Sequence, residues 1–118
     1  HFFVQARSPA CSTTSWAVKV RSNGFEDWHV HPGGWLTAVY YVKVPAVESA
    51  QDDTHEGGIT FGLPDYEGMP DAGSDWTHIH PHGGMLGLFP SHCFHRTWPT
   101  RQEHDRWVVV FDVMPIAE

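Results

Sequence analysis

Apolar and polar residues alternate over short runs of this chain. The run "SWAVKV" at residues 15–20 places Trp16, Val18 and Val20 on the side opposite to the residues between them. A period of two is typical of a strand that buries one face. No stretch has a convincing apolar period of 3.6 residues, so we expect strands rather than helices to build the core.

Four more apolar runs carry strand signals. The strongest, "WLTAVYYVKV" at 35–44, is rich in β-branched and aromatic residues. The others are "GGITFGL" at 57–63, "GMLGLF" at 84–89 and "RWVVVFDVM" at 106–114, with turn-forming segments between them. Short strands separated in this way predict an all-β fold, and the simplest arrangement is a jelly roll, the double-stranded β-helix of cupin-like barrels.

The size and charge of the chain narrow its class. Its 118 residues predict one domain over 1–118, and because the sequence starts at His1 rather than at Met, further N-terminal elements are allowed for. A formal charge of −7 with only 7 Lys and Arg argues against a nucleic-acid partner. No run is long enough for a membrane span, and no signal peptide is recognised, so a cytoplasmic protein is expected. Cys11 and Cys93 are expected to be reduced thiols. An exposed edge strand could pair two copies of the chain, so the sequence is compatible with a homodimer.

Histidine is the most unusual enrichment, with 10 in the chain, and it gathers in two similar motifs. They are "HVHPGG" at 29–34 and "HIHPHGG" at 78–84. Histidine is both a common metal ligand and the side chain that titrates near neutral pH. The question is which motif, if either, binds a metal.

The first motif is the better metal site. His29 and His31 would share one face of a strand, and they run directly into the strongest strand of the chain. A third ligand is expected from "LFPSHCFHRTWP" at 88–99, where His95 is the better candidate and His92 the competitor. Three such ligands leave up to three positions open on an octahedral ion.

The second motif is expected to be a turn that enters a strand. It follows a polar loop, and its histidines are predicted to be exposed or to line the rim of the barrel: His78, His80 and His82.

Arg106 lies eleven residues beyond His95, at the start of the last predicted strand. A turn of that length would return it to the barrel near the metal. A buried arginine is costly unless it meets an anion, and its planar fork suits a carboxylate. The alternative is a surface ion pair with an acidic neighbour: Glu103, Asp105 or Asp112. Arg96 and Arg101 fit such a surface role better.

Three segments, in order, resemble a known group of enzymes. "HVHPGGWLTAVYYVKVP", "LFPSHCFHRTWP" and "DRWVVVFDVMP" are similar to the 2-oxoglutarate/Fe(II)-dependent oxygenases of the double-stranded β-helix superfamily, above all to a bacterial and phage branch. Prolyl hydroxylases are similar over the first segment. The resemblance covers roughly residues 16–115.

The resemblance implies Fe(II) as the metal and 2-oxoglutarate as the cosubstrate. His29 would be the first iron ligand and His95 the distal one, while Arg106 would bind the far carboxylate of 2-oxoglutarate. Residues of one strand face would contact the cosubstrate or line its pocket: Thr37, Val39 and Tyr41.

Two positions depart from the family pattern. In the family pattern "HxD" the second ligand is a carboxylate, and here that position is His31. Three neutral histidines leave a ferrous site one charge more positive than two histidines and a carboxylate do. Val108 occupies a place where many relatives carry a serine that helps to hold the carboxylate. Trp28, Trp35 and Trp98 flank the ligands and could form an apolar wall, although aromatic residues are more often part of the core.

The implied activity is hydroxylation of an unidentified small molecule or peptide side chain. One alternative is a cupin-like metal protein or dioxygenase without 2-oxoglutarate, because "GMLGLFPSHCFH" at 84–95 has the spacing of the second cupin motif. The first cupin motif, however, requires a glutamate a few residues after "HVH", and the sequence there reads "PGGWLTAVYY". Another is a catalytically silent binding module. Loops near 46–58 and 64–83 would set the substrate.

Overall fold

The computed structural model describes residues 10–45, 55–68, 73–101 and 105–116. These residues form seven strands and no helix. The strands are β1 (Cys11–Val20), β2 (Leu36–Lys43), β3 (Ile59–Phe61), β4 (Thr77–Ile79), β5 (Leu86–Pro90), β6 (His95–Thr97) and β7 (Arg106–Pro115).

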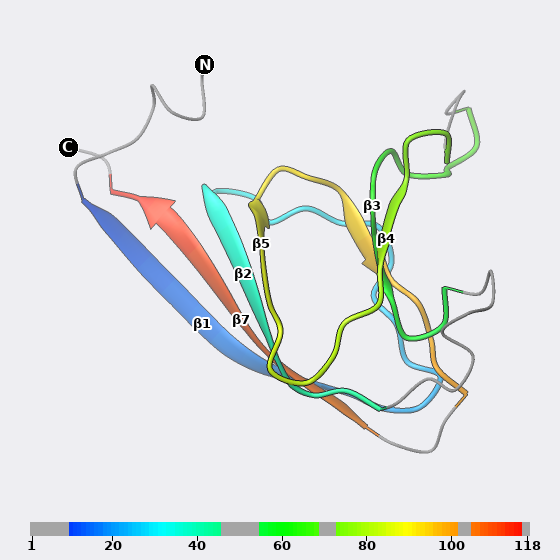
Figure 1. Cartoon of the computed structure of the whole chain (residues 1–118). Helices are drawn as coiled ribbons and strands as arrows, with labels where there is room; N and C mark the ends of the chain where they lie inside the picture. The colour runs from blue at the N-terminus through cyan, green and yellow to red at the C-terminus, as the bar shows by residue number, and fades with distance from the viewer. Residues whose placement is uncertain (1–9, 46–54, 69–72, 102–104, 117–118) are drawn as a thin grey trace.

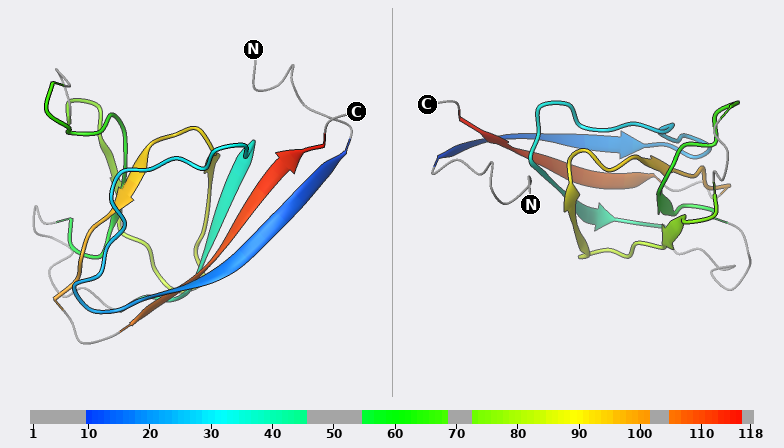
Figure 2. Two further views of the ribbon diagram at one scale, coloured as in Figure 1. Left: turned by 180° about the vertical axis from the view of Figure 1, so that it is seen from behind. Right: turned by 90° about the horizontal axis from the view of Figure 1, so that it is seen from above.

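The strands build two antiparallel sheets. The larger has the order β1-β7-β2-β5 and the smaller the order β4-β3-β6. Figures 1 and 2 show the smaller sheet standing opposite the larger one, with long connections between them. Sequential strands repeatedly cross from one sheet to the other. The predicted double-stranded β-helix is confirmed.

The core lies on the inner face of the larger sheet. Along β2, Thr37, Val39 and Tyr41 are buried, as the period of two requires. They join the buried side chains of β5 and β7, and the core cluster is Val39, Tyr41, Phe89, Val108 and Val110. Because β7 alternates in the same way, Arg106 begins its inner row and Asp112 lies further along the same row.

All five predicted strand segments are strands, but two further strands were missed. β1 starts at Cys11, before the predicted run at 15–20. β6 and β4 have only 3 residues each, too few to show an alternating pattern. β4 includes His78, so the second histidine motif begins as a strand paired with β3 and not as the predicted turn.

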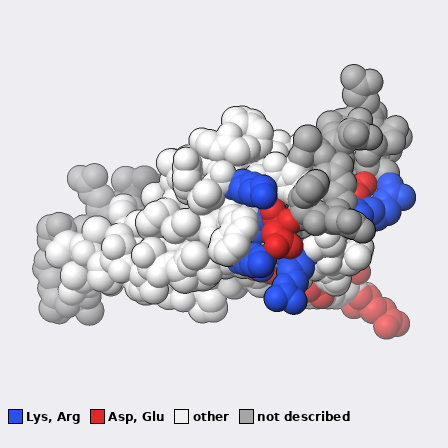
Figure 3. Space-filling model, turned by 90° about the horizontal axis from the view of Figure 1, so that it is seen from below, with Lys and Arg blue, Asp and Glu red and all other residues white. Residues whose placement is uncertain are grey.

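Two ion pairs join charged side chains of the described residues. Lys19 contacts Asp105 at 3.1 Å, and Arg101 contacts Glu56 at 3.3 Å. On the face shown in Figure 3, positive and negative side chains lie next to each other near the middle, and further charged side chains lie toward the right-hand end. Cys11 is exposed, Cys93 is partly exposed, and both are free thiols. Within the described ranges no helix is long and apolar enough to cross a membrane.

Candidate metal centre

The three predicted metal ligands come from two segments far apart in the sequence. His29 and His31 lie in the connection between β1 and β2, and His95 is the first residue of β6. The N–H of His29 donates to the carbonyl of His95 at 3.0 Å, and the reverse bond measures 3.1 Å. The N–H of His31 donates to the carbonyl of Ser91 at 2.9 Å. These backbone bonds fix the three histidines against one another.

His29 and His31 do not stand in a strand, contrary to the prediction. Only an isolated bridge joins His29 to His95. Just beyond, Gly33 has a φ of 80°, and the N–H of Gly34 donates to the carbonyl of His31 at 3.2 Å. A positive φ suits glycine, so the "PGG" sequence turns the chain into β2. The two imidazoles still share one site, with ring centroids 5.4 Å apart.

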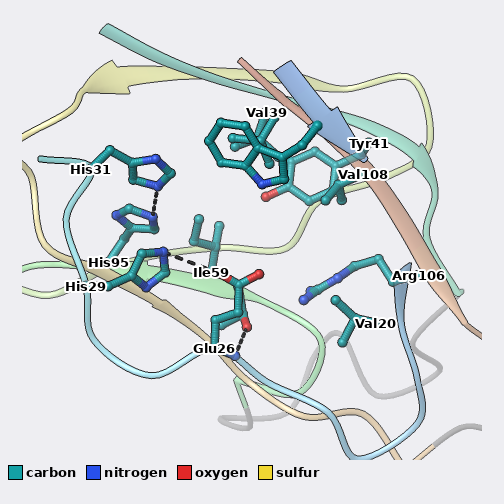
Figure 4. Close-up of a pocket in the computed structure, with 13 residues that line it drawn as sticks. Val20, Glu26, His29, His31, Val39, Tyr41, Ile59, His95, Arg106 and Val108 are labelled. Carbon is teal, nitrogen blue, oxygen red and sulfur yellow. Dashed lines mark hydrogen bonds and ion pairs between the residues drawn. The ribbon is translucent and has the colours of Figure 1, made fainter. Parts of the chain in front are cut away.

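The geometry of the three imidazoles fits one ion. Their ligand nitrogens all lie within 4.8 Å of one another. Figure 4 shows the three rings grouped at one end of the cavity. The Nε2 atoms of His31 and His95 are 3.3 Å apart. Two ligands bound at right angles with bonds of about 2.1 Å lie about 3.0 Å apart. Imidazole nitrogens suit iron, zinc, copper and nickel.

Hydrogen bonds fix which ring nitrogen of each histidine faces the site. The Nδ1–H of His29 donates to the carbonyl of Asp27 at 2.6 Å, and that of His95 to the carbonyl of Cys93 at 3.0 Å. The Nδ1–H of His31 donates to Oδ2 of Asp112 at 3.0 Å. When the three imidazoles are neutral, as metal ligands are, each carries its one N–H at Nδ1, so all three Nε2 lone pairs face the site. Lone pairs this close repel each other unless a cation lies among them.

Burial keeps His95 in the neutral form that a ligand needs. The pKa of His95 is lowered to about 4, mainly because burial removes water from around the ring. The hydrogen bond to the carbonyl of Cys93 raises the pKa and only partly offsets this effect. At neutral pH a metal ion therefore does not compete with a proton for this nitrogen.

The metal-free protein is expected to lose stability as the pH falls from about 6.5 to about 4. In that window the unfolded chain takes up a proton at His95 while the folded protein does not. The free energy of unfolding falls by about 3 kcal/mol across the window. Urea unfolding with a chelator present measures it, and in His95→Gln this part of the pH dependence disappears. Parallel pH profiles for the two proteins would contradict the assignment.

Asp112 supports the site from behind, a role that the sequence did not reveal. Its Oδ1 accepts a hydrogen bond of 2.7 Å from the hydroxyl of Thr37, whose oxygen lies 2.8 Å from the hydroxyl of Ser91. Thr37 and Ser91 are fully buried. The carboxylate of Asp112 thus holds His31 in place and supplies negative charge one step away from the ion.

Replacing Asp112 by asparagine is expected to weaken metal binding roughly ten- to a hundredfold, because such outer partners orient the ligand and raise its basicity. Titration with a divalent metal measures the change. Asp75→Asn, at an exposed carboxylate, is the control for net charge. Equal affinities in the two variants would show that Asp112 does not act through His31.

Arg106 is a buried cation that forms no salt bridge with a described residue, and the acidic residue whose charge acts on it is Glu26, in the same cavity. It is 6% exposed, and its Nη1 donates to the carbonyl of Gly57 at 3.2 Å. Its buried Nε has no hydrogen-bond partner. The predicted surface partners are taken: Asp105 pairs with Lys19, and Asp112 with His31. Glu103 lies outside the described residues. An arginine in this state is suited to receive an anion.

Arg106 and the three histidines line one cavity, of about 60 Å³. Val39 and Tyr41 line it as expected, whereas Thr37 is not among its lining residues. The hydroxyl of Thr37 serves Asp112 instead. Val108, in the serine slot, adds an apolar wall.

The tryptophan that lines this cavity is Trp16, and the three expected ones are not among its lining residues. Trp28 is buried, and its indole N–H donates to Asp65 at 2.6 Å. The indole N–H of Trp98 donates to Thr60 at 2.7 Å. The wall prediction was wrong, since none of the three tryptophans lines the cavity, and Trp28 belongs to the buried core.

The second histidine motif lies apart from the centre. Nδ1 of His78 is 2.6 Å from the hydroxyl of Thr60, and its ring stacks on His55 with centroids 3.6 Å apart. His78, His80 and His82 are exposed, as predicted for the second motif, and the competitor His92 is exposed as well. In the part of the chain that the structure describes, the group that could hold an ion is His29, His31 and His95.

The sequence matches one protein family. The family described as "Putative 2OG-Fe(II) oxygenase" matches residues 14–112, a range that includes the three histidines and Arg106. The chain belongs to this family of oxygenases, as the motifs indicated. A search of curated protein sequences gives no match.

Solved structures of oxygenases share the fold. A prolyl-4-hydroxylase from Pseudomonas putida superposes with a TM-score of 0.65 at 15% identity, over 89% of this chain and 54% of that one. The nickel complex of the non-heme monooxygenase ThoJ superposes with a TM-score of 0.58 at 11% identity, over 96% of this chain and 48% of that one. The chain thus spans about half the length of each. At these identities the likeness establishes the fold.

Proposed function

We propose that this protein is an Fe(II)- and 2-oxoglutarate-dependent hydroxylase that acts on a small molecule or a peptide side chain. The observation that carries the proposal is Arg106, a buried guanidinium with an unpartnered Nε in the same cavity as three converging imidazoles. A dicarboxylate whose one end reaches the metal and whose other end reaches Arg106 would satisfy both.

Each residue of the cavity has a task in this proposal. His29, His31 and His95 hold the ion, and Asp112 orients His31. Arg106 anchors the distal carboxylate, next to the buried ring of Tyr41. The valines of β2 and β7 keep water out, which strengthens the ion pair. Iron and 2-oxoglutarate, when bound, would supply the oxidation of a substrate C–H bond.

A larger hollow adjoins the metal cavity and is suited to the apolar part of a substrate. It has a volume of about 350 Å³ and shares Val39, Tyr41 and Ile59 with the metal cavity. Phe61 and Phe89 also line it. The similar structure from Pseudomonas putida is named as a prolyl-4-hydroxylase, which supports including peptide side chains among the substrates to test.

The second candidate is a cupin-like metal protein or dioxygenase that does not use 2-oxoglutarate. The observation that favours it is His31, because the third ligand is a neutral imidazole where the family pattern has a carboxylate. In this case Arg106 would bind the anionic substrate itself.

Succinate formation decides between the two candidates. Purified protein loaded with Fe(II) under anaerobic conditions is given 2-oxoglutarate and then oxygen. The first proposal predicts succinate that depends on both iron and 2-oxoglutarate, even at the slow rate expected without substrate. Tight metal binding with no succinate, and with no effect of 2-oxoglutarate on the bound metal, would contradict it and favour the second.

A further inference from the structure

Glu26 brings a carboxylate to the metal centre from a place that the motifs do not mark. It precedes His29 by three residues and lines the cavity that contains the histidines and Arg106. Its Oε2 lies 3.3 Å from Nε2 of His29. In Figure 4 the carboxylate lies between His29 and Arg106. It therefore occupies the side of the centre on which a cosubstrate would approach.

The backbone of Glu26 is held by the strand that carries His95. Its N–H donates to the hydroxyl of Thr97 at 2.8 Å, and its carbonyl accepts a bond of 2.9 Å from the N–H of Thr97. His29 pairs with His95 in the same local ladder. The side chain of Glu26 is 46% exposed, so it is free to turn while its backbone stays in register with the site.

When His29 is in the neutral form that binds a metal, its contact with Glu26 joins two acceptors. In that form the one N–H of the ring is at Nδ1 and is donated to the carbonyl of Asp27, so Nε2 faces the carboxylate with a lone pair. The carboxylate also carries only lone pairs. A cation shared by the two atoms makes this contact favourable, and the triad at the same place offers the site for one.

We propose that Glu26 is a fourth ligand of the metal ion when no cosubstrate is bound. Oxygen ligands are accepted by iron, and a carboxylate would remove one positive charge from a centre that His31 leaves without its usual carboxylate. Glu26 reaches the ion from the side of His29, whereas Asp112 acts from behind His31. Glu26 thus supplies, from another part of the chain, the negative charge that the carboxylate of "HxD" supplies in the family pattern.

The number of coordination positions determines what happens to Glu26 when the cosubstrate binds, and this step rests on the proposed function. An octahedral ion with four protein ligands keeps two positions, and both are needed by a chelating keto acid. None would remain for oxygen. Glu26 therefore gives up its position when 2-oxoglutarate binds, so its carboxylate protects the centre until the cosubstrate arrives.

The test compares wild-type protein with Glu26→Gln, which keeps the size of the side chain and removes its charge. Binding of Co²⁺ to the full chain is followed by calorimetry, first alone and then in the presence of 2-oxoglutarate. Glu67→Gln, at an exposed carboxylate outside the cavity, controls for net charge. Without cosubstrate, Glu26→Gln is expected to bind Co²⁺ roughly tenfold more weakly, while the control is unchanged. Binding of 2-oxoglutarate to the cobalt-loaded variant is expected to be several-fold tighter than to wild type.

Unchanged cobalt affinity in Glu26→Gln would overturn the assignment of Glu26 as a ligand. Weaker cobalt binding with unchanged 2-oxoglutarate affinity would overturn its displacement. Failure of both cobalt-loaded proteins to bind 2-oxoglutarate would contradict the proposed function, and the cobalt titration alone would still decide whether Glu26 is a ligand.

Discussion

Replacement of His29 by alanine abolishes retention of the metal and leaves the β fold in place. Each of the three imidazoles supplies a lone pair that the other two cannot replace, so we expect a loss of more than about a hundredfold in affinity, beyond that for an outer partner. The fold survives because His29 holds its neighbours through backbone bonds to His95, which alanine keeps. Metal content after desalting and the circular dichroism of both proteins measure the two effects.

His78→Ala is the matched control, because it removes a histidine from the corresponding position of the second motif. His78 contacts Thr60 and His55 and lies outside the metal group, so metal content should stay at the wild-type level. A loss of metal in His78→Ala as large as that in His29→Ala would mean that the first motif was wrongly chosen.

Replacement of Arg106 by methionine is expected to remove 2-oxoglutarate binding while metal stays bound. Loss of one partner from a buried charge pair weakens binding by about 2–5 kcal/mol, which is roughly thirtyfold to several thousandfold. Methionine keeps much of the apolar stem, and the buried, unpaired Nε disappears. The melting temperature of the metal-loaded, cosubstrate-free protein should therefore not fall. Calorimetric titration with 2-oxoglutarate and a thermal melt test both parts.

Arg101→Met is the control for charge, since Arg101 is an exposed arginine paired with Glu56. Its affinity for 2-oxoglutarate should equal that of wild type. If Arg106→Met binds 2-oxoglutarate normally, or melts at a much lower temperature than wild type, the role of Arg106 is to stabilise the fold and not to bind the cosubstrate.

The residues that the sequence located well are those marked by local spacing. The histidines of "HVHPGG", the distal His95 and the arginine at the start of β7 all line the cavity that their motifs predicted. The buried rows of β2 and β7 followed from alternation alone, because one face of each strand meets the core.

The residues that it missed act through pairing between distant segments. Asp112 reaches His31 and Thr37 because the register of β2 on β7 sets Thr37 opposite Asp112. Glu26 is fixed by Thr97 of β6. The register between two strands cannot be read from the pattern within either one. For this reason Thr37 was predicted to line the pocket, whereas its hydroxyl donates to Asp112 on the neighbouring strand.

Local conformation also limited the prediction of the elements. Two histidines separated by one residue suggest a strand, but the turn at Gly33 and Gly34 begins immediately after them. A side chain at Gly34 would lie 2.5 Å from the hydroxyl of the buried Ser91, so the glycine there serves close packing as well. Such packing depends on the opposing segment and cannot be read from the motif.

Location of the bound metal tests the central claim most directly. A crystal of the protein loaded with Co²⁺, measured at the cobalt absorption edge, gives the position of the ion from its anomalous signal. We predict one ion per chain, about 2.1 Å from Nε2 of each of His29, His31 and His95. An ion bound elsewhere, such as at His78 and His55, or three rings turned away from any ion, would contradict the account.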